Sequence, residues 1–262
     1  MLLIRQSQME ALRLASFQGF RARALSHVTL HFPNHARVAG DAALEATVDH
    51  NLARGADYGM RTERTALLYL TTAMMLGSGF DRSPAFPWAA EILTADRRPV
   101  DRATDLAHAA LAHQKRIAGK NNLAMNRAFL SLARVFGALS SPDAAPGFGM
   151  GLSAGLADLH PERAEAFGAE VMTRLDEEAV SRAAAYGFAG PNGPALIGVY
   201  MFFIGWNPEE EPFTPWAHET LTGPNHADGA ARQAAFHAAA TEFLNLWLQH
   251  PGRGGLTDVR LQ

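Results

Sequence analysis

The stretch Pro87-Trp88-Ala89-Ala90-Glu91-Ile92-Leu93-Thr94 recurs 128 positions later as Pro215-Trp216-Ala217-His218-Glu219-Thr220-Leu221-Thr222. The same offset pairs further Gly, Pro, Arg and Tyr positions without a gap: Pro33 with Pro161, Gly40 with Gly168, Arg54 with Arg182, Tyr58-Gly59 with Tyr186-Gly187, Gly77 with Gly205, and Pro84 with Pro212. A unit of this length exceeds the roughly 20–50 residues of solenoid repeats. The sequence therefore predicts two tandem copies of one small domain.

Apolar side chains recur every three to four residues through both copies, which is typical of amphipathic helices. Asp41 is expected to cap one helix, which Gly59 ends in the left-handed conformation. The almost wholly apolar segment Thr65–Leu76 predicts a buried central helix. The expected helices are 6–32, 42–58, 62–76, 87–93 and 100–117 in the first copy, and 122–139, 162–186, 193–205, 215–221 and 230–248 in the second.

The copies diverge most at residues 141–155, which are rich in Gly, Pro and Ala and are expected to form a loop. The alternation typical of strands is found nowhere in the sequence. We therefore expect an all-α fold with two lobes of about five helices each. Residues 1–119 form the first lobe and residues 120–262 the second, with the boundary near Gly119-Lys120.

Composition excludes several function classes. A net charge of -3 gives no general attraction for nucleic acid, and the lack of cysteine excludes disulfides and thiolate metal sites. The start of the sequence lacks the pattern of a signal peptide. The longest apolar run, Ala195–Trp206, falls short of the roughly 20 residues that span a bilayer. We expect a cytoplasmic protein without stable membrane insertion, which a specialised secretion machine could still export.

The repeated aromatic residues allow two interpretations. Tyr58, Trp88, Tyr186 and Trp216 could line a ligand site between the lobes. The favoured interpretation is structural, because Gly after each Tyr suits a helix end, Pro before each Trp suits a helix start, and Trp fills a helix junction.

Motifs for metal binding and catalysis are weak. Asp105 and His108 share a helix face, but the second copy has Phe236 at the position of His108, so we expect no metal and no cofactor. Gly151-Leu152-Ser153-Ala154-Gly155 has the spelling of a nucleophile elbow without the preceding strand that this motif requires. We therefore assign no catalytic residue, and an enzymatic role is the less expected one.

One loop differs in charge between the copies. Asp81-Arg82-Ser83 in the first copy becomes Glu209-Glu210-Glu211 in the second, close to Trp206 and Phe213. The simplest expectation is a solvated, exposed acidic loop. The alternative is a surface that binds a basic partner through these five residues.

Four motifs of the first copy carry a resemblance to a known family: Ile4-Arg5-x-x-Gln8, His31-Phe32-Pro33, Tyr58-Gly59-x-x-Thr62-Glu63 and Leu76-Gly77-x-x-Phe80-Asp81-x-x-Pro84-x-x-Pro87-Trp88-Ala89. Together they resemble an uncharacterised family of bacterial helical proteins associated with type VI secretion spike and effector genes. The resemblance covers residues 4–118, and the second copy lacks the Thr-Glu and Phe-Asp elements. It implies a bacterial partner protein, such as a secreted effector, and no catalytic residue.

Three functions follow as hypotheses. The first is a non-enzymatic protein–protein interaction module, such as an adaptor, a chaperone or an immunity-like partner of a secreted effector. The second is an enzyme or small-ligand receptor with a site between the lobes. The third is a membrane-active protein that would expose its two most apolar helices.

Overall fold

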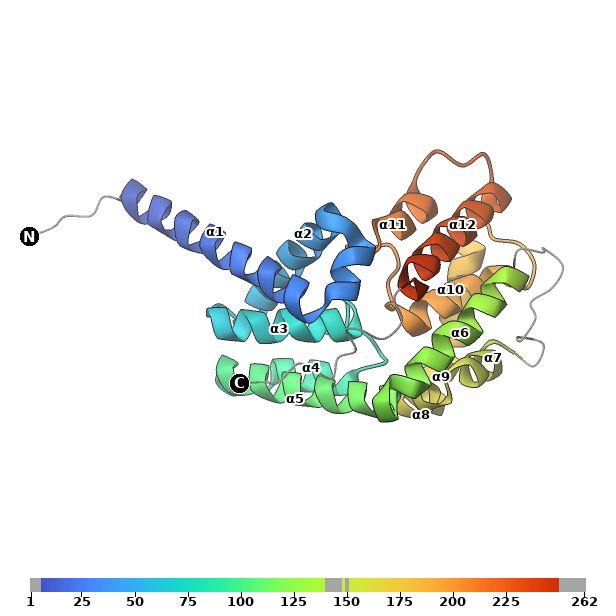
Figure 1. Ribbon diagram of the computed structural model, residues 1–262, viewed down its shortest axis with the longest axis horizontal. Coiled ribbons are helices and arrows are strands. Elements are labelled where there is room, and N and C mark those ends of the chain that lie inside the picture. Colours follow the sequence, from blue (N-terminus) through green and yellow to red (C-terminus); the bar gives the residue numbers. More distant parts are fainter. Residues whose placement is uncertain (1–5, 140–147, 149–150, 250–262) are drawn as a thin grey trace, which may run out of the picture.

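The computed structural model describes residues 6–139, 148 and 151–249, and this part of the chain is all helical. It contains twelve α-helices and one short 3₁₀ helix, and no strand occurs among the described residues. The all-α prediction is confirmed. Helices α1–α5 gather at one end of the molecule and α6–α12 at the other (Figure 1). We refer to these two groups as the N-terminal and C-terminal halves.

The N-terminal half is built around α3. Its helices are α1 (Gln6–His31), α2 (Pro33–Asp57), α3 (Glu63–Leu76), α4 (Pro87–Thr94) and α5 (Pro99–Ala118). Thr62 and Thr65 form a reciprocal capping box at the start of α3, and Gly77 ends the helix with φ 93°. Helix α3 packs against α1, α2 and α5, so the most apolar segment of this half is also its centre.

The C-terminal half contains more helices than the sequence predicts. They are η1 (Lys120–Asn122), α6 (Leu123–Ala138), α7 (Leu152–Leu159), α8 (Pro161–Phe167), α9 (Ala169–Ala185), α10 (Asn192–Phe203), α11 (Pro215–Thr222) and α12 (Gly229–Leu248). The apolar helix α10 is buried against α9 and α7. The chain turns from one half to the other at Gly119, Asn121 and Asn122, which all have positive φ.

Two expected helix boundaries are wrong for the same reason. Helix α2 begins at Pro33 rather than after Asp41, and it breaks at Gly40, where φ is 73° and ψ is 168°. The expected helix 162–186 is likewise divided into α8 and α9 at Gly168, with φ 81° and ψ 165°. Proline fits the first turn of a helix, and glycine tolerates a backbone conformation that other residues avoid.

The expected loop at 141–155 is wrong at its end. Leu152–Gly155 belongs to α7, where Ser153 donates a hydrogen bond of 3.0 Å to the Met172 carbonyl. Apolar Leu156 and Leu159 then anchor α7 in the core. Residues 141–147 and 149–150 lie outside the described part of the chain.

Several contacts recur at corresponding positions of the two halves. Arg54 pairs with Asp81 at 2.7 Å, and Arg182 pairs with Glu209 at 3.0 Å. The corresponding residues Tyr58 and Tyr186 each accept a hydrogen bond at the backbone carbonyl, from Arg102 at 3.0 Å and from Arg232 at 2.8 Å. These two arginines are 130 rather than 128 positions apart, so only the tyrosines of this contact follow the repeat. The duplication stays a prediction, and these paired contacts support it.

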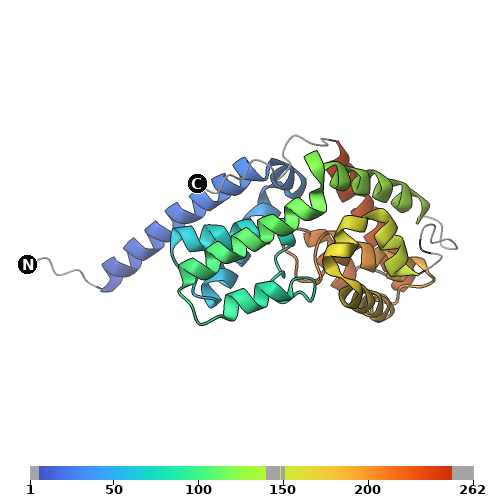
Figure 2. The ribbon, with the colours of Figure 1, turned by 90° about the horizontal axis from the view of Figure 1, so that it is seen from below.

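The two halves pack directly on each other, as the view from below also shows (Figure 2). Helix α5 contacts α8, and α2 contacts α12. Phe86 of the N-terminal half meets Phe167 of α8 edge-on, with 5.9 Å between the ring centroids. Ser78 donates hydrogen bonds from its N–H and its hydroxyl to the two carboxylate oxygens of Glu211, which lies 133 positions away in the sequence.

Candidate functional site

A cavity of about 440 Å³ lies between the two halves. The buried helices α3 and α10 form part of its wall, and α6 and α12 close much of the rest. The apolar side chains that line it are Ala73, Met74, Met75, Leu76, Ala118, Met125, Phe129, Leu130, Leu132, Phe136, Leu196, Val199, Phe203, Ile204, Phe213, Phe236, Ala240, Phe243, Leu244, Trp247 and Leu248. Leu130 of α6 is exposed, which indicates that the cavity opens along this helix.

A polar network crosses between the halves at the wall of the cavity. One carboxylate oxygen of Glu211 accepts from the Ser78 N–H at 2.8 Å, and the other accepts from the Ser78 hydroxyl at 2.7 Å. The Phe213 N–H also donates to Glu211, and Asn51 donates to the Ser78 oxygen at 3.0 Å. Burial raises the pKa of Glu211, and these donors oppose that effect. The acceptor capacity of Glu211 is therefore largely used within the protein.

Arg163 of α8 lines the same cavity and is 6% exposed. Its guanidinium carbon lies 5.6 Å from the ring centroid of Phe167, 5.7 Å from that of Phe202 and 5.9 Å from that of Phe203. Its Nε atom is buried without a hydrogen-bond partner, and the side chain forms no ion pair with the described residues. Burial lowers the pKa of Arg163 to about 10, so the side chain stays charged at neutral pH.

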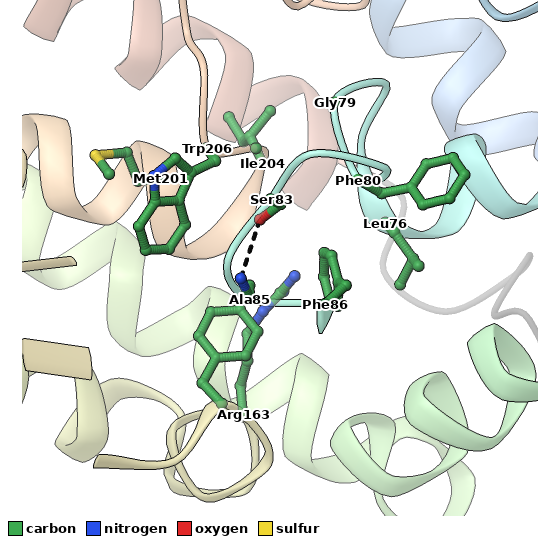
Figure 3. Close-up of a pocket in the computed structure, with 12 residues that line it drawn as sticks. Leu76, Gly79, Phe80, Ser83, Ala85, Phe86, Arg163, Met201, Ile204 and Trp206 are labelled. Atoms are coloured by element: carbon green, nitrogen blue, oxygen red, sulfur yellow. Dashed lines mark hydrogen bonds between the residues drawn. The ribbon is translucent and has the colours of Figure 1, made fainter. Parts of the chain in front are cut away.

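A second, much smaller pocket lies beside Arg163 (Figure 3). Its volume is about 10 Å³, and Ala85, Phe86 and Trp206 contribute to its wall. A space of this size holds about one water molecule. Any larger group that contacts Arg163 must therefore come from the 440 Å³ cavity.

His35 and Arg163 occupy corresponding positions of the two copies, and both line the cavity. His35 contacts Phe32, Phe213 and Trp247, with ring centroids 5.4, 5.4 and 4.8 Å away. Burial lowers the pKa of His35 to about 4, so this imidazole is neutral at pH 7. At pH 7, therefore, Arg163 is charged at the wall of the cavity, whereas the corresponding His35 is neutral.

The four repeated aromatic residues do not meet at one site. Trp216 lines the cavity, where its ring lies 5.3 Å from Phe236 and its Nε1 has no hydrogen-bond partner among the described residues. Tyr58 instead donates to Asp81 at 2.8 Å, and Tyr186 lies beside Phe188 with 5.9 Å between the ring centroids. Trp88 packs beside Phe86. All four side chains are half-buried against the core.

The expected exposure of the acidic loop is wrong for three of its five residues. Trp206, Glu211 and Phe213 are buried, because Trp206 donates to Glu178 at 2.7 Å, Glu211 binds Ser78, and Phe213 packs on Phe243. Glu209 pairs with Arg182 at 3.0 Å, and the exposed Glu210 pairs with Arg82 at 2.7 Å. Much of this loop therefore joins parts of the same chain.

The described residues contain no group of His, Asp and Glu that could hold a metal ion. Within the same part of the chain, the helices are too short or too polar to cross a membrane. Ser153 lies on α7, where its hydroxyl is engaged by the Met172 carbonyl. Comparison with protein-family models, curated proteins and solved structures finds no match to this chain.

Sequence reasoning missed Arg163, Ser78 and the internal role of Glu211. One signal was present: the repeat aligns His35 with Arg163, both two positions after the proline that begins a helix. Because both copies have a polar residue at this position, the two side chains could have been expected to line the same cavity. Nothing local in the sequence predicts that Ser78 and Glu211 meet.

Proposed function

We propose that this protein is a receptor for a small, mainly apolar molecule, which binds in the cavity between the two halves. The observation that carries the proposal is a cavity of about 440 Å³ whose wall is mainly apolar. The polar side chains in this wall are those of Asn34, His35, Thr47, Ser78, Gln114, Asn122, Asn126, Arg163, Tyr200 and Glu211. Small-molecule sites typically have volumes of roughly 300–1,000 Å³ and this kind of lining.

The size of the cavity sets the size of the ligand. An apolar cavity of about 150 Å³ accepts benzene. The present cavity is about three times that volume, which suits a molecule with on the order of 15–20 non-hydrogen atoms. An elongated aliphatic chain fits this range and the aliphatic and aromatic lining.

The test is a fluorescence titration with the neutral probe N-phenyl-1-naphthylamine, followed by displacement with dodecan-1-ol. Ala240 lies in the cavity wall, so Ala240→Phe fills ligand space. We expect saturable probe binding to the wild type and a loss of affinity of at least tenfold in Ala240→Phe. The matched control is Ala112→Phe, which adds the same group to the exposed surface of α5 and leaves binding unchanged. A wild-type protein that binds neither compound saturably would contradict the proposal.

A second candidate function is the protein–protein interaction module, which the exposed apolar residues of α1 support. Ala24 and Val28 bury the second half of α1 against the body, whereas its first half extends away from it (Figure 1). Leu14 and Phe17 on this extension are 61% and 47% exposed, and residues three apart lie on one helix face. An exposed apolar face suits a contact with another protein. The resemblance to companions of type VI secretion genes suggests a secreted effector as that partner.

Co-expression with the products of neighbouring genes tests this second candidate. We expect a stoichiometric complex in size-exclusion chromatography, lost in the double variant Leu14→Glu and Phe17→Glu. The control Leu123→Glu changes an equally exposed residue of α6 and should leave the complex intact. A complex that survives the double variant would exclude α1 as its binding surface.

A further inference from the structure

Arg163 is a buried cation without an anion. The described residues give its side chain neither a carboxylate nor a hydrogen-bond acceptor, and its Nε is buried and unpartnered. Its titratable neighbours are His113 and His160, whose pKa values burial and Arg163 itself lower to about 4. Both imidazoles are therefore neutral at pH 7, and neither supplies a countercharge.

A buried charge without a partner is unfavourable, because the protein interior replaces little of the hydration that the guanidinium loses. The rings of Phe167, Phe202 and Phe203 offset part of this cost by cation–π attraction. They cannot accept the in-plane hydrogen bonds of the guanidinium. The guanidinium carries five N–H donors in a planar fork, and none of them has an acceptor among the described residues.

The other polar groups of the cavity do not provide that acceptor. Glu211 already accepts hydrogen bonds from Ser78 and Phe213. Glu211 and Arg163 form no ion pair or hydrogen bond with each other in the described part of the chain. Trp216 adds a further unpartnered donor, its Nε1. Gln114, which also lines the cavity, has a buried acceptor oxygen without a partner, but an amide oxygen is neutral and supplies no countercharge for Arg163.

We infer that Arg163 binds the carboxylate of an amphiphilic ligand, so that the ligand of this cavity is a monocarboxylate with an aliphatic chain, such as a fatty acid. This inference rests on the proposed receptor function. One guanidinium balances one negative charge, and its fork matches the two oxygens of a carboxylate. Phe203 lies beside Arg163 and also lines the cavity, so the chain of the ligand extends from the guanidinium along apolar side chains.

The experiment compares two ligands with the same chain. Dodecanoate and dodecan-1-ol each displace N-phenyl-1-naphthylamine from the full-length protein, in mildly alkaline buffer where the acid is ionised. We expect wild-type protein to bind dodecanoate roughly tenfold tighter than the alcohol, as hydrogen bonds between charged groups imply. Arg163→Met should abolish this preference and leave the affinity for dodecan-1-ol unchanged. The control Arg127→Met removes an exposed charge of α6 and should keep the preference.

The outcomes separate the two proposals. Binding of neither ligand would overturn the receptor function itself. Equal binding of both by the wild type, or a preference that survives Arg163→Met, would overturn only the role of Arg163. Tighter binding of dodecyl phosphate than of dodecanoate would replace the carboxylate by a phosphate. If Arg163→Met does not fold, the wild-type preference and its reduction in Arg163→Lys, which keeps the charge without the fork, decide the question.

Discussion

Arg163 combines a high energetic cost with a position at the cavity wall. The residue is 6% exposed. Its guanidinium contacts three phenylalanine rings and pairs with no carboxylate among the described residues. If this position served only the fold, a methionine or a leucine would fill it at a lower energetic cost than an arginine. The physical cost of the charge is therefore an argument for a ligand.

Arg163→Met should stabilise the protein in the absence of ligand. Replacing buried charged groups by apolar side chains of similar volume is often neutral or stabilises by about 1–4 kcal/mol, and an unpaired charge has no ion pair to lose, so we expect a gain within this range. Urea unfolding of the ligand-free protein measures the change. Arg64→Met, which removes an exposed arginine of α3, serves as the control and should stay within about 0.5 kcal/mol. A large loss of stability in Arg163→Met would mean that the guanidinium supports the fold.

Glu211 illustrates how a single side chain joins the halves. Glu211→Ala leaves the N–H groups of Ser78 and Phe213 without their acceptor inside the protein. Each buried unsatisfied donor costs about 1–3 kcal/mol, so we expect the two to lower the free energy of unfolding by about 2–6 kcal/mol, measured by urea unfolding. Glu211→Gln keeps one acceptor oxygen and should lose less.

The neighbouring Glu210→Ala is the matched control for this prediction. Glu210 is exposed and pairs with Arg82 at the surface, where an ion pair contributes about 0–1 kcal/mol. Equal effects of the two alanine substitutions would show that the bond from Glu211 to Ser78 does not hold the halves together.

Among the elements, the broken helices at Gly40 and Gly168 are the most informative. The conformations at the two breaks agree within about ten degrees, and a Cβ added at either glycine meets no atom within 4 Å. Packing therefore does not require glycine at these positions. The positive φ does, since this region of backbone space is open almost only to glycine.

Gly40→Ala and Gly168→Ala should destabilise the protein to a similar extent, by about 1–3 kcal/mol each. Thermal unfolding followed by circular dichroism measures both. Gly137→Ala is the control, because this glycine lies inside α6 and has free space around its Cβ position, so alanine should be neutral or slightly stabilising. A different loss of stability in Gly40→Ala and Gly168→Ala would weaken the case for a duplication, in which the two parts of α2 correspond to α8 and α9.

At the scale of the whole molecule, the halves share one continuous hydrophobic core. We expect the histidines buried beside Arg163 to make the stability of the protein depend on pH. His160 is fully buried, and burial and then Arg163 lower its pKa from 6.5 to about 4. The unfolded state therefore binds this proton at a higher pH than the folded state. Stability is fully present above pH 6.5, falls as the pH drops toward 4, and levels off below that value.

His160→Gln should flatten this acid dependence. A difference of about 2.5 pKa units between the states corresponds to about 3 kcal/mol, which is the largest loss that His160 can cause between pH 6.5 and 4. Urea unfolding at a series of pH values measures the slope. The exposed His108→Gln should leave the slope as it is in the wild type. An unchanged slope in His160→Gln would place the acid sensitivity elsewhere, with His113 as the next residue to test.

The sequence by itself determined the helical class and most of the helix ends, because the signals that set them are local. Thr62, Thr65 and Gly77 frame α3 by hydrogen bonds and backbone conformation within a few residues, and Pro87 begins α4 in the same local way. The apolar character of Thr65–Leu76 likewise predicted the buried position of α3. The family resemblance and the interaction function remain predictions.

Only the tertiary structure decided where the site lies. Glu211 reads as an exposed acid beside two other glutamates, yet it meets Ser78 across 133 positions of sequence. Arg163 reads as one more charge near the start of the expected helix 162–186, yet the packing of α8 against α5 and α9 turns it inward. The reason is physical: a helix pattern specifies which face is apolar, whereas burial and charge pairing depend on which distant elements cover that face.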